Sequence, residues 1–434
     1  MKKEEFINEQ IEQLLNNGSD SADLKIVSEE IKKIMKDVDN NSPSELINNF
    51  SKEILERSYE FLNEQNAEKE NIIEGLSTCI YLPDINGEYK LKFVGGKTSE
   101  GFDVNDETLF DIASITKMYT LLLTFKLEEL GYLSLNNKIV DLDSRFTGLE
   151  DFTIKDLILL CGILYTNGNV KDGVDINDAN KILQTVYLKS NDRNANTYTD
   201  LGMIVLSKVI EKIMSEKLGR EVLFDEIMNE YLFKPFDLNS TKFNPVNYNL
   251  AGNGNKEGLV HDPKARILGG AVGSAGIFTN ADDLARLAKE MYLVNYANYD
   301  HIKNLVSPKN LKAMGTVTFP DAPQNNKGLV GLYQKNPDRQ NKWLNPLVYG
   351  DNSFTAQGFT GAAASFDPVN KIHNSYLFGS IKEGQSKKPD GFLPAFGKYQ
   401  KYIVSKTLSL LIAKKYYEMQ SENLNIDQTF KIYH

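Results

Sequence analysis

Apolar side chains recur at helical spacing in the first seventy residues. Three runs carry apolar positions three or four residues apart, and the polar segments NNGSDSAD and DNNSPSEL separate them. This spacing gathers the apolar side chains on one face of a helix, and the polar segments contain cap residues such as Ser44. The pattern predicts three amphipathic helices. Their apolar positions are Ile7, Ile11, Leu14, Val27, Ile31, Ile34, Met35, Ile47, Phe50, Ile54 and Leu55.

From about residue 72 the pattern becomes that of strands. The runs STCIYLP and EYKLKFVG flank a DING turn, and Asn86-Gly87 at its tip is a strong β-hairpin signal. Strand-like runs return after residue 270 in GIFT, GAAASFD and NSYLFGSI, and DDLARLAKEMY between them predicts a helix. The segment GKYQKYIVSKTLSLLIAKKYYEMQ predicts a last, long helix.

The middle of the chain is predicted to be helical. The segment after Lys117 is apolar almost all round as far as Gly131, which is typical of a buried central helix, and further helices are predicted within 150–235. The order of elements predicts an α/β (α+β) fold with one antiparallel sheet assembled from both ends of the chain. Helices from the N- and C-terminal parts flank this sheet, and an all-helical region of about 112–265 is inserted.

Residues 1–70 are predicted to be a helical N-terminal extension, and residues 71–434 the main domain. The extension carries a net charge of −8 out of −10 for the whole chain. Its apolar faces allow two interpretations, which stay open. The helices either pack on the main domain as a cap or bind a protein partner or a second copy of the chain.

Composition narrows the possible partners. The acidic balance argues against nucleic acid or an anionic membrane surface, because both attract clustered Lys and Arg. The first residues lack the apolar run of a secretory signal, and no later window is apolar enough to span a membrane. We therefore expect a cytoplasmic protein that acts on a small molecule or peptide. Cys79 and Cys161 are expected to be separate buried thiols, and the four histidines show no metal-ligand spacing, so no metal or cofactor is expected.

The strongest chemical signal is Ser114-Ile115-Thr116-Lys117, the one S-x-x-K in the chain. Residues three apart share a helical face, so the Lys117 ammonium can reach the Ser114 hydroxyl. A serine hydroxyl needs such help because it is a weak nucleophile. A buried lysine readily shifts its pKa downward and can then accept or pass a proton. The motif predicts Ser114 as a nucleophile that Lys117 activates.

Four segments in order resemble the serine β-lactamase and penicillin-binding-protein superfamily, closest to its class C β-lactamase and esterase branch. FDIASITK resembles the active-site segment, and Tyr198-Thr199-Asp200 stands where the family has its Tyr-x-Asn motif. The segments LVHDPKARILGGAVGSAGIFTNADDLARLAK and FTAQGFTGAAASFDP are similar to later parts of the family. The resemblance covers residues from about 72 to the end and implies a β-lactamase/DD-peptidase-like fold.

The resemblance also implies a mechanism. Ser114 would attack an ester or amide carbonyl and form an acyl-enzyme, with Lys117 and Tyr198 sharing general-base and general-acid work. Asp200 would bind Lys117 or the substrate amide. The backbone N–H groups of Ser114 and Phe359 would form the oxyanion hole, beside Gln357 and Gly358 of the third motif.

The third motif departs from the family pattern. Ala356-Gln357-Gly358 replaces Lys or His, then Thr or Ser, then Gly, so the cation that helps to bind a substrate carboxylate is missing. Ser274 also stands where many relatives have His. The predicted function is a serine hydrolase or acyltransferase for a small ester, amide or D-amino-acid peptide. The alternative is a catalytically impaired binding or regulatory protein of the same fold, and a His261-Asp262 triad with Ser114 is a weaker catalytic alternative.

Overall fold

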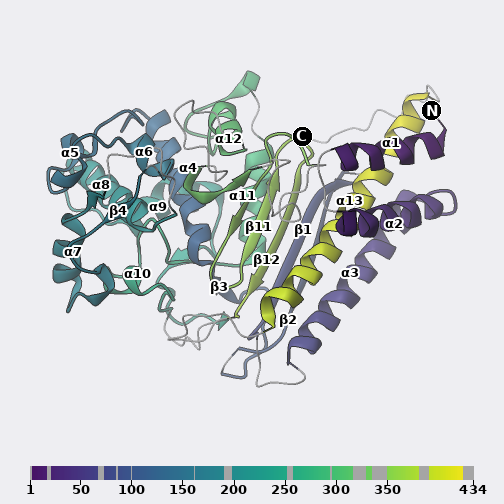
Figure 1. Cartoon of the computed structure of the whole chain (residues 1–434), viewed down its shortest axis with the longest axis horizontal. Coiled ribbons are helices and arrows are strands. Elements are labelled where there is room, and N and C mark those ends of the chain that lie inside the picture. Colours follow the sequence, from purple (N-terminus) through teal and green to yellow (C-terminus); the bar gives the residue numbers. More distant parts are fainter. Residues whose placement is uncertain are drawn as a thin grey trace.

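The main sheet of the protein has six strands in the order β2-β1-β12-β11-β10-β9, and every neighbouring pair is antiparallel (Figure 1). Its strands are β1 (Leu76–Asp84), β2 (Gly87–Gly95), β9 (Tyr333–Gln334), β10 (Phe354–Gln357), β11 (Ala363–Asp367) and β12 (Ile372–Phe378). The first two strands lie far in sequence from the other four. The predicted antiparallel sheet, assembled from distant parts of the chain, and the α/β fold class are therefore confirmed.

This computed structural model describes most of the 434 residues. The described ranges are 2–16, 21–66, 73–84, 87–98, 100–160, 162–189, 198–251, 258–293, 296–315, 329–334, 349–380 and 391–423. Within them the predicted hairpin is confirmed, because β1 and β2 pair along their whole length from Leu76 opposite Gly95 to Asp84 opposite Gly87. Asn86 at the predicted tip lies outside the described residues.

A second sheet has four short strands in the order β6-β8-β3-β7. They are β3 (Leu109–Asp111), β6 (Lys242–Phe243), β7 (Leu250–Ala251) and β8 (Ile277–Thr279). The prediction that GIFT joins the main sheet is wrong, since this segment forms β8 and pairs with β3 and β6. β3 has three residues and leads directly into the segment that carries Ser114, so this small sheet holds the start of the candidate site.

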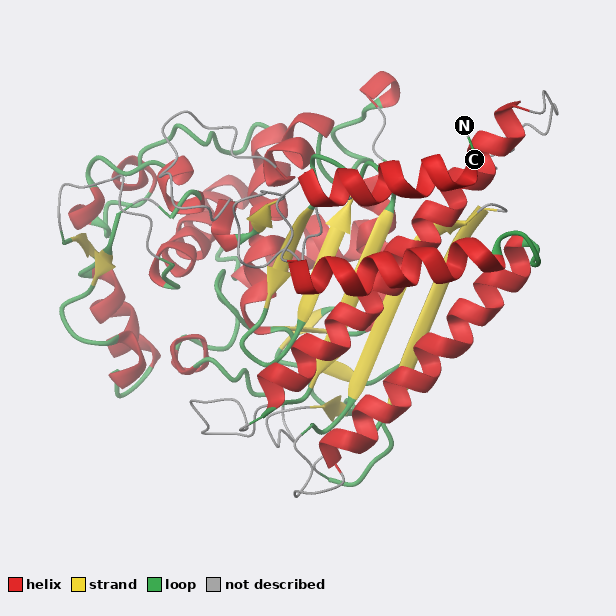
Figure 2. Ribbon diagram, turned by 45° about the vertical axis from the view of Figure 1, so that its right-hand side comes forward, coloured by secondary structure: helices red, strands yellow, loops and turns green. Residues whose placement is uncertain are grey.

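One face of the main sheet is covered by helices from both ends of the chain (Figure 2). These helices are α1 (Lys3–Asn16), α2 (Ser21–Asp37), α3 (Pro43–Asn66) and α13 (Phe392–Asn423). The alternation of side chains along β1 explains how the sheet forms two cores. Ile80 and Leu82 pack in the core under these four helices, whereas Cys79 and Tyr81 point into the core on the opposite face.

The N-terminal helices are tied to the main domain by buried contacts. The Phe61 ring of α3 stacks on the Tyr399 ring of α13 at a centroid distance of 4.5 Å. The Tyr399 hydroxyl forms hydrogen bonds with Ser58 Oγ at 2.8 Å and with Thr78 Oγ1 of β1 at 2.7 Å. The three predicted helices are present and pack as the first interpretation expects. The domain division at residue 70 and a partner-binding role stay predictions.

The central helix α4 (Thr116–Glu129) is buried along nearly all its length, as its apolar sequence predicts. Gly131 follows its end with a φ of +70°, a left-handed conformation that glycine adopts without steric cost. Other helices are α5 (Ile139–Leu142), α6 (Ile154–Ile158), α7 (Ile176–Gln184), α8 (Leu201–Leu218), α9 (Phe224–Met228), α10 (Pro263–Ile267), α11 (Ala281–Tyr292) and α12 (Pro308–Gly315). The inserted region is not all-helical, because β6, β7 and the pair β4 (Leu164–Tyr165) and β5 (Tyr187–Leu188) lie within it.

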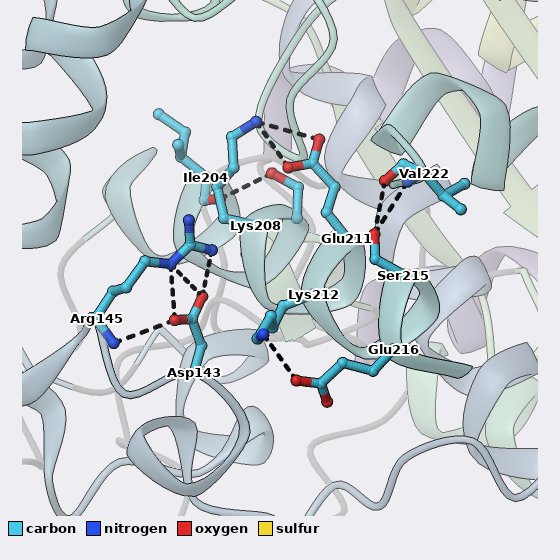
Figure 3. A network of polar contacts seen from close by, with 10 residues as sticks. Asp143, Arg145, Ile204, Lys208, Glu211, Lys212, Ser215, Glu216 and Val222 are labelled. Carbon is cyan, nitrogen blue, oxygen red and sulfur yellow. Dashed lines mark hydrogen bonds and ion pairs between the residues drawn. The ribbon is translucent and has the colours of Figure 1, made fainter. Parts of the chain in front are cut away.

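Polar contacts fix the position of α8 within the helical region (Figure 3). Ser215 Oγ accepts the Val222 N–H at 3.0 Å, which joins α8 to the segment after it, and within the helix Lys208 Nζ donates to Glu211 Oε2 at 2.9 Å. Glu211 also accepts the N–H of Phe224 at 3.0 Å, which joins α8 to the start of α9. These bonds hold the helix whose first turn follows Asp200, a predicted site residue.

Two further expectations concern membrane spans and the two cysteines. Among the described residues, no helix has both the length and the apolar character of a membrane span. The cytoplasmic location stays a prediction. Cys79 is a buried free thiol, and burial raises its pKa to about 12. Cys161 lies outside the described residues.

If α3 belongs to the same cooperative core as the sheet, Phe61→Ala should lower the free energy of unfolding by about 3–5 kcal/mol. Phe61 is fully buried, so the substitution leaves a cavity beside Tyr399. Urea unfolding measures the effect, and Asn63→Ala, an exposed position on the same helix, serves as the control. Equal stability of the two variants would contradict the packing described above.

Candidate active site

Ser114 lies in a short 3₁₀ segment, η1 (Ala113–Ile115), directly before α4. Its neighbour Ala113 has a φ of +46°, a conformation that non-glycine residues rarely adopt. Such a conformation costs on the order of 1–3 kcal/mol and persists only where surrounding contacts enforce it. The backbone around the candidate nucleophile is therefore held in place by its neighbours.

Asp111 supplies one of these contacts and also binds two later segments of the chain. This buried carboxylate accepts the Ala113 N–H at Oδ1 and the His261 N–H at Oδ2, each at 2.8 Å. The backbone carbonyl of Asp111 also accepts the Thr360 hydroxyl at 2.7 Å. One residue at the end of β3 thus connects the nucleophile segment with two later parts of the chain. The sequence analysis missed Asp111, although a carboxylate between Phe110 and Ile112 is itself a signal of a buried polar role.

Lys117 is buried, with a side chain 1% exposed, and it reaches Ser114 as predicted. Its Nζ donates to Ser114 Oγ at 2.8 Å, to Asp200 Oδ1 at 2.9 Å and to the Ser274 carbonyl at 3.1 Å. An ammonium has three N–H donors, and these acceptors match all three. The hydrogen-bond geometry is therefore that of a charged lysine.

The expected downward shift of the Lys117 pKa is wrong. Burial does lower the pKa of this ammonium, but the Asp200 carboxylate and the Tyr198 hydroxyl raise it, and the net result lies above the ordinary value of 10.5. An opposite charge at hydrogen-bond distance outweighs the loss of solvent here. The carboxylate stands where the family pattern has a neutral amide. In the resting site Lys117 holds its proton.

Asp200 precedes α8 and binds two lysines. Its Oδ1 pairs with Lys117, and its Oδ2 lies 2.9 Å from Nζ of Lys264, which belongs to α10. Burial raises the pKa of this carboxyl, but Lys117 and Lys264 lower it to about 2. Asp200 is therefore ionised throughout the neutral range. Sequence reasoning missed Lys264, because nothing in HDPKA sets it apart from other surface lysines.

Tyr198 lies beside the lysine, as predicted. The centroid of its ring is 4.8 Å from Lys117 Nζ, and the residue is 40% exposed. The two residues and Ser114 line one pocket of about 120 Å³. Among the described residues, the rest of the pocket wall is formed by Met118, Val330, Leu332, Tyr333, Ala356 and Gln357.

The third motif contributes Ala356 and Gln357 to the wall of the pocket. Gln357 ends β10, and the turn that follows is closed by the hydrogen bond from Gly358 N–H to the Ala362 carbonyl at 2.7 Å. Gly358 packs against the nucleophile segment so closely that a Cβ there would lie 2.4 Å from the Ile112 carbonyl oxygen. Phe359 comes next, and its N–H has no acceptor among the described residues. The Phe359 N–H, the predicted oxyanion donor, thus makes no hydrogen bond to the described residues, and it follows the glycine that packs against the nucleophile segment.

The structure gives Asp262 and His261 contacts other than those of the alternative triad. Asp262 Oδ1 accepts the Ala265 N–H at 2.8 Å and caps α10. The His261 ring lies against the Phe359 ring at a centroid distance of 5.4 Å. In the described part of the chain, no group of three His, Cys, Asp or Glu side chains is placed to hold a metal ion. The pocket therefore brings together the three predicted catalytic residues, Ser114, Lys117 and Tyr198.

Known proteins share this arrangement of elements. The β-lactamase family model matches residues 86–389. A provisionally named D-alanyl-D-alanine carboxypeptidase from Escherichia coli O157:H7 is 27% identical over an alignment of 311 positions, which covers 61% of this chain and 67% of that protein. A class C β-lactamase in complex with cefoxitin superposes with a TM-score of 0.58 at 14% identity, covering 83% of this chain and 98% of the other.

EstCE1, described as a hydrolase with promiscuous acyltransferase activity, is similar in fold. It has a TM-score of 0.58 at 15% identity and covers 82% of this chain and 99% of its own. The structural neighbours at this identity establish the fold, and the family match with the curated relative supports hydrolase activity. Because the family model spans most of the chain, the protein belongs to the β-lactamase family.

Proposed function

We propose that the protein is a serine hydrolase or acyltransferase that forms an acyl-enzyme on Ser114. The observation that carries the proposal is the 2.8 Å hydrogen bond between Lys117 Nζ and Ser114 Oγ inside the pocket. A nucleophile within reach of a proton-transfer group, with a third group that orients that partner, is the arrangement that activated serines require. Asp200 has the third role.

The reaction would begin when the Lys117–Tyr198 pair loses one proton to solvent. The pair can then accept the proton of Ser114 while Oγ forms a bond to the carbonyl carbon of the substrate. The N–H groups of Ser114 and Phe359 would stabilise the oxyanion. Cleavage of the ester or amide bond releases the leaving group, which takes the proton from the pair. Water, or an acceptor alcohol or amine, then removes the acyl group from Ser114.

The pocket favours neutral substrates. Val330, Leu332 and Ala356 give it apolar surface, and Gln357 offers a hydrogen-bond donor without charge. Loss of a charged contact to a carboxylate typically weakens binding by about 1.5–3 kcal/mol. We therefore expect small esters or amides to react better than penicillins or peptides with a free terminal carboxylate.

A second candidate is a binding or regulatory protein that keeps the fold. It is favoured by the replacement of the third-motif cation by Ala356 and by the charged state of Lys117, since an ammonium cannot accept the serine proton. This candidate requires that Ser114 does not react at an appreciable rate. Active-site labelling separates the two.

A fluorophosphonate probe should label the protein at Ser114, and Ser114→Ala should lose the label completely. Ser134→Ala, which changes a hydroxyl of a surface turn, should label at the normal rate. Gel fluorescence and peptide mass spectrometry measure the result. Absence of Ser114-dependent labelling would favour the binding protein. A fluorescent penicillin that labels as fast as the phosphonate would contradict the preference for neutral substrates.

Gly358→Ala should slow labelling of Ser114 by about tenfold to a hundredfold. The added Cβ would meet the Ile112 carbonyl at 2.4 Å, so β10 and the Phe359 N–H must move away from the nucleophile. Gly397→Ala in α13 is the matched control, because a Cβ there meets nothing within 4 Å. Equal labelling rates for the two alanine variants would exclude the Phe359 N–H from the oxyanion site.

A further inference from the structure

The Asp200 carboxylate is shared between two ammonium groups from different helices. Lys117 of α4 contacts Oδ1 and Lys264 of α10 contacts Oδ2, and both N–O distances are 2.9 Å. Lys117 is buried, whereas the Lys264 side chain is 25% exposed. Lys264 thus lies on the solvent side of the carboxylate and Lys117 on the Ser114 side.

We propose that Lys264 is a positioning residue that acts through Asp200 to set the pH at which Ser114 becomes reactive. The inference rests on the proposed function, since it concerns the same proton transfer. Lys264 lies outside the sequence motifs that contain the nucleophile and its base. The proposed role follows from the shared carboxylate alone.

The physical reason is competition for one negative charge. Before Lys117 and Tyr198 can accept the serine proton, the pair must lose a proton, and the Asp200 carboxylate opposes that loss. A second cation on the same carboxylate offsets part of its charge and also repels the Lys117 ammonium. Both effects make the proton easier to lose.

The charged and titratable groups that face Lys117 and Lys264 favour or disfavour the charged forms of these two lysines. Among the described residues, Lys117 faces Asp200 and Tyr198, which favour its ammonium, and the repulsion between the two ammonium groups lowers the pKa of Lys264. Lys264 in turn faces Asp200 and Asp262, the latter at 3.9 Å. Asp262 is the N-cap of α10, so the start of this helix keeps Lys264 near Asp200.

The test follows the rate of Ser114 phosphonylation between pH 6 and pH 10 in the full-length protein. We expect the wild-type rate to rise with pH, because deprotonation of the Lys117–Tyr198 pair creates the base. Lys264→Gln should move this rise to higher pH by about one unit, which is roughly a tenfold loss of rate at a given pH. Lys264→Arg, which keeps the cation, should stay within about twofold of the wild type.

Asp200→Asn should move the rise in the opposite direction, to lower pH, because it removes the anion. Lys138→Gln is the matched control, since Lys138 pairs with Asp151 at 3.4 Å on the surface, and its rates should equal those of the wild type. NMR titration of ¹³C-lysine signals, with Lys117 assigned by its loss in Lys117→Arg, gives a direct second readout. Lys264→Gln should move the Lys117 midpoint to higher pH.

The possible results are distinguishable. If the wild-type protein shows no Ser114-dependent labelling, the proposed function fails. If it labels normally but Lys264→Gln has the wild-type pH dependence, the role of Lys264 is overturned. A loss of rate without a change in the Lys117 midpoint would also overturn it, since that is the result of a merely structural contact between α10 and α8.

Discussion

The site depends on one buried cation and its three acceptors. Lys117 can stay charged away from water because its ammonium donates hydrogen bonds to the Ser114 hydroxyl, the Asp200 carboxylate and the Ser274 carbonyl. A buried ammonium without such partners would lose its proton or destabilise the fold. The same bonds fix where the Ser114 hydroxyl lies. The same hydrogen bonds therefore compensate the buried charge of Lys117 and orient the nucleophile.

The fold meets this constraint by bringing distant segments together around the start of α4. β3 ends at Asp111, which holds both the Ala113 and the His261 backbone. The end of β10 approaches so closely that only glycine fits at 358. The two sheets and the helical region thus meet at the nucleophile, whereas α1–α3 and α13 cover the far face of the main sheet.

Local patterns predicted the parts of the site that are close in sequence. Ser114 and Lys117 are three residues apart, and helical geometry alone brings them together. The hairpin and the buried central helix were also predictable, because their signals lie within single runs of sequence. The short strand β3 and the separate pairing of β8 were not, since three-residue strands carry too little pattern. The roles of Tyr198 and Phe359 came from a family resemblance and stay predictions.

The charge state of Lys117 shows why other properties of the site could not be predicted from the sequence. Burial alone predicts a lowered pKa, and the sequence does indicate burial. The opposite direction results from Asp200, which lies 83 residues away in sequence and contacts Nζ at 2.9 Å. The second lysine on that carboxylate comes from a third segment. No linear pattern encodes how strongly one carboxylate is shared between two cations.

The most direct test of the central claim is to trap the covalent intermediate. The protein would be mixed with p-nitrophenyl acetate, quenched in acid within the first turnover and digested for mass spectrometry. The predicted result is one acetyl group per molecule on the peptide that contains Ser114, formed together with a burst of p-nitrophenol. Release of p-nitrophenol without acetylation of Ser114, or acetylation confined to another residue, would contradict the assignment of Ser114 as the nucleophile.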